Sequence, residues 1–547
     1  MVNVLTLAPV LILLLGALVL IPGRIYGRFR PFISLAVVLI TALFLFLNAR
    51  QSNPVQLAFP DAAGGVDLDL TFNWSAVGLV LVSVVLLAFV ARLFAENLSA
   101  PVGPGALVTL AGVVVFLCAN NWVTLIAGWV LVDLGLLSSR LGTATDSTPR
   151  AAIWRSFGIS QLGAVLLLAA GVSLLNDGLS LRLSDTALGA GAATLVIFAA
   201  WIRTGFWPFH YAPPEEPDPP HSWSLYDLAI TGLLGLFLLV RGILRLQEDP
   251  LYPELIQYLA LLGLAAATLL ALSEHGEQPR IAWAVRALGA PLFLLTIIAV
   301  VSHVGIVIWL MLDLFNLVNL ALAAAVFRPQ TVRQPWRQVL WGAVLLCAVG
   351  FPLTPGFLGR VGYYAAVIQG GDQMLFAAIL GTTTLALIPV WRGFLSAGAG
   401  ESRNPTPVEY VGLALLLLPV VIEGVLPFRV TALFGREVED ASAFAYDALV
   451  HSSSLWQPII LVGATLLPLP LSYFLARAVD PLRVRIGALP QALTTFLDLS
   501  FFSDAFAALV DVLGEGVRQL SALIELHPVG WILFAAIWVA LWLLNIR

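Results

Sequence analysis

The sequence contains no lysine, and all 27 of its basic residues are arginine. A lysine inside a protein can shift its pKa and give up a proton, whereas an arginine keeps its charge. Any proton transfer by this chain must therefore depend on side chains other than its cations.

Charge is scarce in general. Only 11% of the residues are charged and 60% are hydrophobic, with a mean hydropathy of +0.96. Soluble domains carry about 25% charged residues, so this chain lacks the polar surface that would cover it in water. Its net charge of −5 also argues against nucleic acid as a partner.

The chain has few of the residues and motifs that carry chemistry. Its two cysteines, Cys118 and Cys347, lie inside apolar runs and support neither a disulfide framework nor a metal site. The phosphate-binding glycine loop, the G-x-S-x-G elbow, the H-E-x-x-H zinc motif and iron–sulfur cysteine clusters are also missing from the sequence. We therefore expect no cofactor, no metal, no redox centre and no catalytic residue.

Long apolar runs dominate what is present. Runs of about 18–25 residues match a helix that crosses about 30 Å of hydrocarbon. Only helices and closed barrels satisfy their backbone groups in lipid, and the runs lack the strict alternation of barrel strands. The sequence predicts an all-α polytopic membrane protein with about 14–16 transmembrane helices. The predicted spans are residues 4–22, 31–48, 73–95, 105–119, 121–139, 157–175, 190–208, 223–244, 255–272, 287–301, 303–327, 336–358, 374–396, 408–427, 456–476 and 528–546.

The C-terminal region differs from the rest. Residues 490–526 repeat apolar positions at helical spacing but carry too many charges to span a bilayer. We expect an amphipathic helix that lies along the membrane surface or against neighbouring subunits.

Arginine-rich loops after the first span and near residues 140–155 place the N-terminus outside the cytoplasm of a prokaryotic inner membrane.

Two predicted spans are interrupted in the same manner. One ends in Trp-Pro-Phe-His at residues 207–210, and the other carries two prolines between Gly350 and Gly356. Proline breaks a helix, and broken helices persist in membranes only where protein buries them or water reaches them. Either proline group by itself fits an ordinary helix end at the surface. The matched pair, with an arginine beside each break, indicates two inverted repeats with a site between them.

Ionisable residues inside spans are the functional candidates, because a charge at mid-bilayer costs about 2.5–3.5 kcal/mol. Asp227 and Asp313 are both positioned to pair with an arginine in a folded bundle. The candidates are Asp133, Arg203, His210, Asp227, His303, Asp313, Arg360, Arg392 and Glu423.

Structural alternatives exist for several of these candidates. Arg392 and Glu423 lie near span ends, where long side chains reach the interface. His303 fits a hydrogen-bonded core histidine. Asp133 and Arg203 fit a static buried ion pair that fixes helix packing.

Three segments carry a resemblance to a known family. They are AWIRTGFWPFHYAPPEEPDPPHSWSLYDLAITGLLGLFLLVR at 200–241, FPLTPGFLGR at 351–360 and GWVLVDLG at 128–135. In order and spacing, over residues 70–400, the chain resembles the antiporter-like, proton-translocating membrane subunits of respiratory complex I, multisubunit cation/proton antiporters and membrane-bound hydrogenases. The layout of residues 490–546 is similar to the largest member type of complex I.

The resemblance implies roles for particular positions. The family has a glutamate–lysine pair in its first half, a central relay lysine or histidine and a lysine or glutamate at its second break. By position, these residues fall on Val130 (with Asp133 one turn further on), Arg203, Asn316 and Arg360, and a family histidine falls on Asp227. Arginine keeps the positive field of the family's lysines but is a poor proton carrier.

The resemblance also implies an organisation in six segments. They are 1–100, N-terminal transmembrane helices; 101–245, first repeat; 246–400, second repeat; 401–480, C-terminal transmembrane helices; 481–527, lateral helix; and 528–547, final span.

Our first functional hypothesis is an antiporter-like, non-catalytic subunit of an NADH-quinone oxidoreductase-like complex. It would move protons, with sodium as the alternative ion, in concert with other membrane and peripheral subunits. The predicted path comprises Asp133, Arg203, His210, Asp227, His303, Asp313, Asn316, Arg360, Arg392 and Glu423. A second hypothesis is a non-conducting membrane anchor, for example of an inorganic-carbon uptake complex. A third, a free-standing transporter of a small solute, fits the broken helices but not the lateral helix.

Overall fold

The computed structural model divides the chain into two compact units, Met1–Gly487 and Ala488–Arg547. The second unit lies outside the described residues, and so do the predicted lateral helix, the final span and His303. The described residues are 4–21, 29–48, 55–57, 69–95, 98, 102–142, 147–183, 187–210, 223–243, 250–273, 277–296, 308–309, 311–318, 334–354, 356–369, 373–396, 406–427, 436–451 and 456–486.

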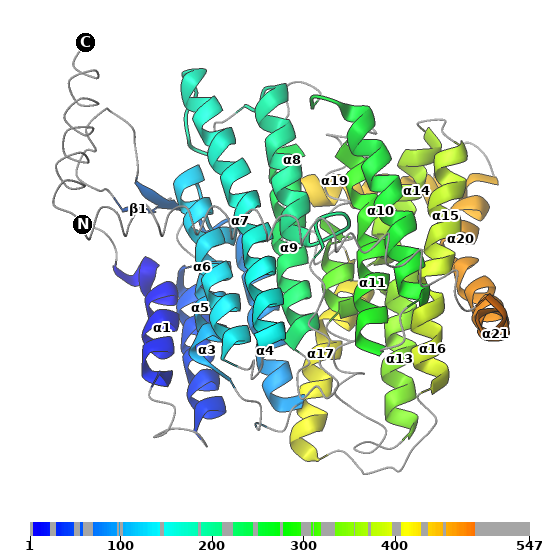
Figure 1. The fold of residues 1–547 in the computed structure, drawn as a ribbon, viewed down its shortest axis with the longest axis horizontal. Coiled ribbons are helices and arrows are strands. Elements are labelled where there is room, and N and C mark those ends of the chain that lie inside the picture. The colour runs from blue at the N-terminus through cyan, green and yellow to red at the C-terminus, as the bar shows by residue number, and fades with distance from the viewer. Residues whose placement is uncertain are drawn as a thin grey trace. The chain divides into compact units, whose positions relative to one another are not determined.

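Within the first unit the described elements are almost all helices (Figure 1). The helices of the first half are α1 (Val4–Leu20), α3 (Arg30–Asn48), α4 (Ala76–Ala95), α5 (Pro104–Leu117), α6 (Trp122–Leu141), α7 (Ser147–Asn176), α8 (Ala190–Thr204) and α9 (Trp223–Ile243). Those of the second half are α10 (Pro253–Ser273), α11 (Glu277–Gly289), the 3-10 helix η1 (Ala290–Thr296), α13 (Gln334–Val349), α14 (Gly356–Gln369), α15 (Gln373–Ala386), α16 (Ile388–Ser396), α17 (Pro407–Val425), α19 (Arg436–Val450), α20 (Trp456–Leu466) and α21 (Pro468–Ile486).

The helices confirm an all-α polytopic membrane protein. Among the described residues, eight helices are long and apolar enough to cross a membrane, and four shorter apolar helices accompany them. The described strands, β1 (Val55–Leu57) and β2 (Leu70–Phe72), form one antiparallel pair with Val55 opposite Phe72. The inverted relation of the two predicted repeats stays a prediction.

Some predicted span boundaries are wrong, because hydropathy windows do not detect backbone breaks. The predicted span at 287–301 is the end of α11 followed by η1, and the helix changes type beside Pro291. The predicted span at 336–358 ends at Val349, before the break. The predicted spans at 374–396 and 456–476 are confirmed as helices able to cross a membrane, and each contains a one-residue irregularity next to Pro389 or Pro468, whose rings remove a backbone donor.

Close helix contacts fix the frame around the first candidate residues. Helices α5 and α6 pack backbone to backbone: a β-carbon at Gly112 would lie 2.5 Å from the nitrogen of Val132, and one at Gly128 would lie 2.6 Å from that of Phe116. Real β-carbons do not approach so closely, so glycine permits the contact. Because α6 also packs against α7, and α7 against α8, these helices form a rigid support for Asp133.

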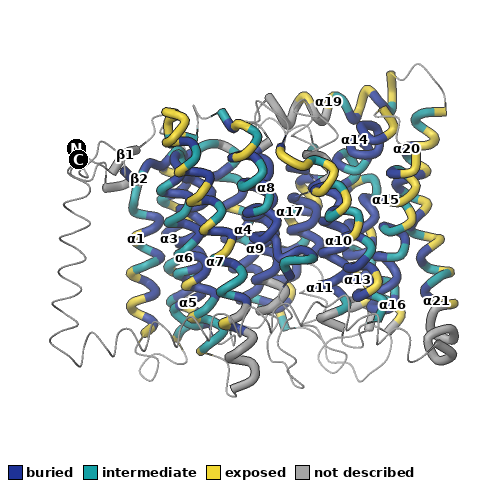
Figure 2. Tube along the Cα trace, turned by 45° about the horizontal axis from the view of Figure 1, so that its top comes forward, coloured by how far each residue is buried: buried dark blue, intermediate teal, exposed yellow. Residues whose placement is uncertain are grey.

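Burial follows the expected membrane arrangement (Figure 2). Helix α7 exposes Leu162, Val165, Leu168 and Val172 along one side, a spacing that forms a single apolar helix face. This face is suited to lipid tails. Helix α17, far away in sequence, packs against α4 and joins the second half of the unit to the first.

Candidate functional site

The first candidate cluster is built on Asp133 of α6 and Arg203 of α8. The Arg203 Nη1 group forms an ion pair with Asp133 Oδ1, and the side chains are 0% and 3% exposed. Asp133 Oδ2 accepts hydrogen bonds from Ser160 Oγ and Gln161 Nε2 of α7, both at 2.8 Å. Three helices therefore converge on one carboxylate.

Further contacts hold the cation of this cluster. Arg203 Nη1 donates to Ser160 Oγ at 3.1 Å, and the guanidinium carbon lies 4.6 Å from the centre of the Trp129 ring. The Trp129 indole N–H donates to the Ser160 carbonyl at 3.2 Å. The Nε and Nη2 groups of Arg203 have no hydrogen-bond partner among the described residues. We call Trp129, Asp133, Ser160, Gln161 and Arg203 the first-half cluster.

The first predicted break lies directly after this cluster. Helix α8 ends at Thr204, and Gly205 follows with a φ of 63°, a left-handed conformation that favours glycine. The Trp201 indole N–H donates to the Trp207 carbonyl at 2.8 Å and fixes the chain beyond the break. Arg203 is thus held in the last turn of a helix that stops inside the protein.

A second ion pair joins α6 to α9. Arg140 Nε lies 2.8 Å from Asp227 Oδ2, and Arg140 Nη1 donates to Ser156 Oγ at 3.0 Å. The prediction that Asp227 pairs with an arginine is confirmed. Its partner comes from a residue that the sequence assigned to a basic loop, because α6 extends to Leu141 and Arg140 occupies its last turn.

The second break has the same local form as the first. Helix α13 ends at Val349, and Gly350 has a φ of 72°. The Gly350 N–H donates to the Cys347 carbonyl at 3.0 Å and the Phe351 N–H to the Leu346 carbonyl at 2.9 Å, the hydrogen-bond pattern of a glycine helix cap. Helix α14 then starts at Gly356, so the span is interrupted as predicted.

Asp313 faces the N-terminus of α14. Its carboxylate accepts the backbone N–H of Gly356, and a β-carbon at position 356 would collide with it. Helix N-termini favour negative charge. Arg360 of α14 lies on the same side, with Nη2 3.8 Å from Asp313 Oδ2, so the prediction that Asp313 pairs with an arginine is also confirmed.

The polar contacts continue from this pair to α17. Asn316, one helical turn after Asp313, donates from Nδ2 to Glu423 Oε2 at 2.7 Å. Asn316 and Glu423 are 3% and 5% exposed. We call Asp313, Asn316, Arg360 and Glu423 the second-half cluster.

The alternative that Arg392 and Glu423 extend to the membrane surface is wrong. Both are buried inside the protein, and Arg392 Nη1 donates to the Leu272 carbonyl of α10 at 3.3 Å. A position near a span end does not decide exposure, because neighbouring helices cover both residues.

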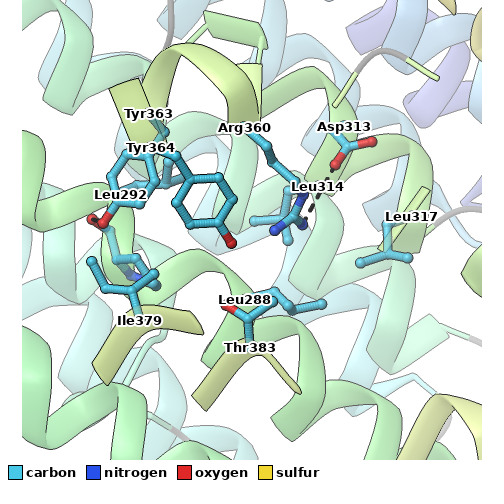
Figure 3. A pocket seen from close by; sticks show the side chains of 11 residues that line it. Leu288, Leu292, Asp313, Leu314, Leu317, Arg360, Tyr363, Tyr364, Ile379 and Thr383 are labelled. Carbon is cyan, nitrogen blue, oxygen red and sulfur yellow. Dashed lines mark hydrogen bonds and ion pairs between the residues drawn. The ribbon is translucent and has the colours of Figure 1, made fainter. Parts of the chain in front are cut away.

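A cavity adjoins the second-half cluster (Figure 3). It has a volume of about 30 Å³, room for roughly two water molecules. Its polar lining comprises Asp313, Arg360, Tyr363, Tyr364 and Thr383. The charges beside the second break therefore lie next to a space that water can occupy.

His210 lies between the two clusters in the chain. It is buried, with its ring 4.6 Å from that of Trp283 in an edge-on arrangement. The guanidinium carbon of Arg286 lies 4.5 Å from the Trp283 ring. Nearby, Trp201 stacks on Phe293 with centroids 4.4 Å apart.

Sequence reasoning missed two buried arginines, Arg92 and Arg286, each 3% exposed. Arg286 lies one residue before the predicted span at 287–301, because α11 starts ten residues earlier, at Glu277. Arg92 lies in the last turn of α4 and acts electrostatically on Asp227. Its position inside a predicted span was a signal available from the sequence.

Metal ligation has no support in the described part of the chain. Among those residues, no group of three or more His, Cys, Asp or Glu side chains is arranged to hold a metal ion. What the clusters offer is fixed arginine charges next to carboxylates, a hydroxyl-lined cavity and neutral hydrogen-bonding groups.

Comparisons with known proteins identify the fold. No protein-family model matches the chain, and no curated protein sequence matches it either. A chain of the Mrp complex from Dietzia sp. DQ12-45-1b superposes with a TM-score of 0.73 at 16% identity, covering 97% of this chain and 63% of that one. This chain thus spans about 63% of the length of that Mrp subunit.

Two other assemblies contain chains of similar structure. A chain of the membrane-bound sulfane sulfur reductase, an archaeal respiratory membrane complex, superposes with a TM-score of 0.63 at 16% identity, covering 98% of this chain and 99% of that one. A chain of respiratory complex I from Thermus thermophilus superposes with a TM-score of 0.60 at 18% identity, covering 82% of this chain and 99% of that one. These matches show that the chain shares its fold with chains of these three membrane complexes, and its apolar helices show a multi-pass membrane protein.

Proposed function

We propose that the chain translocates protons through the charged and polar residues at the centre of its bundle, coupled to a reaction carried out by partner subunits. The observation that supports this proposal most strongly is the burial of an aspartate–arginine pair beside each of two helix breaks. Buried charges in a membrane protein are expensive and mark ion pathways. Interrupted helices provide the polar backbone that such pathways use.

In this mechanism the carboxylates carry the proton and the arginines do not. Arg203 and Arg360 supply a fixed positive potential that stabilises the charged form of the neighbouring aspartate. A proton moves when it binds a carboxylate and later leaves it, so Asp133, Asp313 and Glu423 are the proposed carriers. Sodium is the alternative ion.

The proposed partners are other membrane and peripheral subunits, because each of the similar chains belongs to a larger complex. We place the chain in a prokaryotic inner membrane with its N-terminus outside the cytoplasm, on the basis of its arginine-rich loops. The predicted lateral helix at 490–526 is the segment that we expect to contact neighbouring subunits.

One observation favours a different function. The first-half cluster is densely hydrogen-bonded, and its aspartate contacts an arginine that cannot release a proton. A chain with static ion pairs would serve as a non-conducting anchor, for example in an inorganic-carbon uptake complex.

Proton flux distinguishes the two functions. The complex, solubilised gently with its copurifying subunits, is reconstituted into liposomes that contain a pH-sensitive dye, and a membrane potential is imposed. We expect Asp133→Asn and Asp313→Asn each to reduce flux to the level of empty liposomes. The control is Asp447→Asn, which removes an aspartate whose side chain is 64% exposed. Equal flux in wild type and empty liposomes would support the anchor instead. Wild-type flux that persists in both variants would overturn the proposed carriers Asp133 and Asp313.

A further inference from the structure

The cavity beside the second-half cluster contains hydroxyl groups that the family resemblance does not account for. Tyr364 of α14 and Thr383 of α15 line it together with Asp313 and Arg360. The Tyr364 side chain interacts with both Arg360 and Thr383. In Figure 3 the tyrosine hydroxyl lies between the guanidinium group and the threonine.

We infer that this cavity is a hydrated proton-binding site in which Asp313 takes up the proton from water and the hydroxyls of Tyr364 and Thr383 connect it to α15. The inference rests on the proposed function, because it adds a route from Asp313 towards α15 to the proton path proposed at the second break. It adds two residues, Tyr364 and Thr383, that no position of the family motifs includes.

The geometry of the ion pair favours a bridging water. The 3.8 Å between Arg360 Nη2 and Asp313 Oδ2 exceeds a hydrogen bond, and polar groups at this separation are often joined through water. Asp313 Oδ1 and Arg360 Nε have no hydrogen-bond partner among the described residues. Since buried polar groups almost always find a partner, a cavity with room for roughly two waters fits this need.

The chemistry of the lining assigns the proton to Asp313. Arg360 stays charged, and a neutral tyrosine or threonine relays a proton only by exchanging one O–H bond for another. A proton that arrives on a cavity water forms an O–H bond with the Asp313 carboxylate. On release that bond breaks and a cavity water accepts the proton. The Tyr364 hydroxyl then accepts a proton from that water as it donates its own to the Thr383 hydroxyl, which donates its own to a water on the side of α15.

The neighbouring tyrosine provides a matched control. Tyr363 is on the same helix, is buried and lines the same cavity, but its hydroxyl donates to the Pro291 carbonyl at 3.2 Å. That hydrogen bond engages its only proton. Removing the Tyr363 hydroxyl takes away this bond to Pro291 but no group of the proposed route.

The test compares Tyr364→Phe and Thr383→Val with Tyr363→Phe in the reconstituted complex. We expect Tyr364→Phe to lower proton flux about tenfold, equal to ~1.4 kcal/mol of barrier, and Thr383→Val to lower it to a similar extent. Flux should fall less in Tyr363→Phe than in Tyr364→Phe, and Thr383→Ser, which keeps the hydroxyl, should retain it. Normal flux in both Tyr364→Phe and Thr383→Val, alongside loss in Asp313→Asn, would overturn the hydroxyl route and leave the proposed function intact.

Infrared spectroscopy tests proton binding at Asp313 independently of a flux measurement. Infrared difference spectra across a pH titration should show a carboxylic-acid C=O band that disappears in Asp313→Asn. The band should shift in Tyr364→Phe and stay in place in Tyr363→Phe. If no such band is lost in Asp313→Asn, Asp313 is not the proton-binding group. If the band is present but wild type shows no flux, the site stands and the proposed function fails.

Discussion

One aspartate–arginine pair lies beside each of the two breaks, with Arg203 before the first break and Arg360 after the second, and the surroundings of the two pairs differ. Asp133 and Arg203 are in direct contact, and α7 contributes Ser160 and Gln161 as donors to the carboxylate. Asp313 and Arg360 are 3.8 Å apart and border a cavity of about 30 Å³. The first pair is closed by side chains, whereas the second leaves space for water.

This difference shows that a sequence motif fixes the position of a charged side chain, whereas the side chains packed around it determine whether water can reach it. Around the first pair, a third helix supplies side-chain donors to the aspartate. Around the second, the donor to Asp313 is the backbone N–H of Gly356, and the nearby hydroxyls line the cavity. We therefore expect the first pair to contribute more to stability and the second to respond more to water and protons.

The largest effect should come from breaking the first pair. Arg203→Met leaves the Asp133 charge buried without its partner and should reduce the free energy of unfolding by about 3–5 kcal/mol. The double variant Asp133→Asn/Arg203→Met should recover most of this loss, because no unpaired charge remains. Chemical unfolding in mixed micelles measures both, and Arg360→Met serves as the comparison. A larger loss in Arg360→Met than in Arg203→Met would contradict the difference between the pairs.

A smaller effect is expected from the α7 donor. Ser160→Ala removes one hydrogen bond to the Asp133 carboxylate and one from Arg203, which should cost about 1.5–3 kcal/mol because the partners are charged. Thr383→Val, in the cavity beside the second-half cluster, removes a neutral hydroxyl and should cost only about 0.5–1.5 kcal/mol. The same unfolding assay compares the two. Equal losses would mean that the two sites depend on side-chain donors to the same degree.

The approach of Asp313 to the α14 backbone can be tested at a glycine. A β-carbon at Gly356 would collide with the carboxylate, and overpacking of this kind should cost about 1–3 kcal/mol in Gly356→Ala. The control is Gly381→Ala in α15, where an added β-carbon meets no atom within 4 Å. Alanine is the better helix former, so the control should unfold no more easily than wild type. A stable Gly356→Ala variant would show that Asp313 is free to move away.

The smallest effect concerns the aromatic face on Arg203. Trp129→Phe removes the indole hydrogen bond to Ser160 and weakens the cation–π contact, which should cost about 1 kcal/mol. Trp341→Phe is a matched control, because this buried indole N–H has no acceptor among the described residues. Thermal unfolding of the two variants side by side isolates the polar contribution of Trp129. Identical losses would assign its role to packing alone.

The sequence predicted the helix breaks and the buried charges of the site but not which residues those charges contact. The two breaks follow from prolines 208 and 352 and from glycines that accept left-handed backbone. The burial of Asp133 and Arg203 follows from their place in apolar runs. The partner of Asp227 could not be read from the sequence, because Arg140 is 87 residues away. Arg286 was missed because its helix starts ten residues before the predicted span.

By itself the sequence determined the class of the protein, the existence of the two interruptions and the absence of lysine as a proton carrier. These properties depend on composition and on local backbone chemistry, which act within one or two helical turns. Only the tertiary structure decided that Glu423 bonds to Asn316, that α7 closes the first ion pair and that Tyr364 and Thr383 share a cavity with Asp313. Those arrangements depend on which helices are neighbours. The apolar faces of the spans are too alike in sequence to specify their pairing.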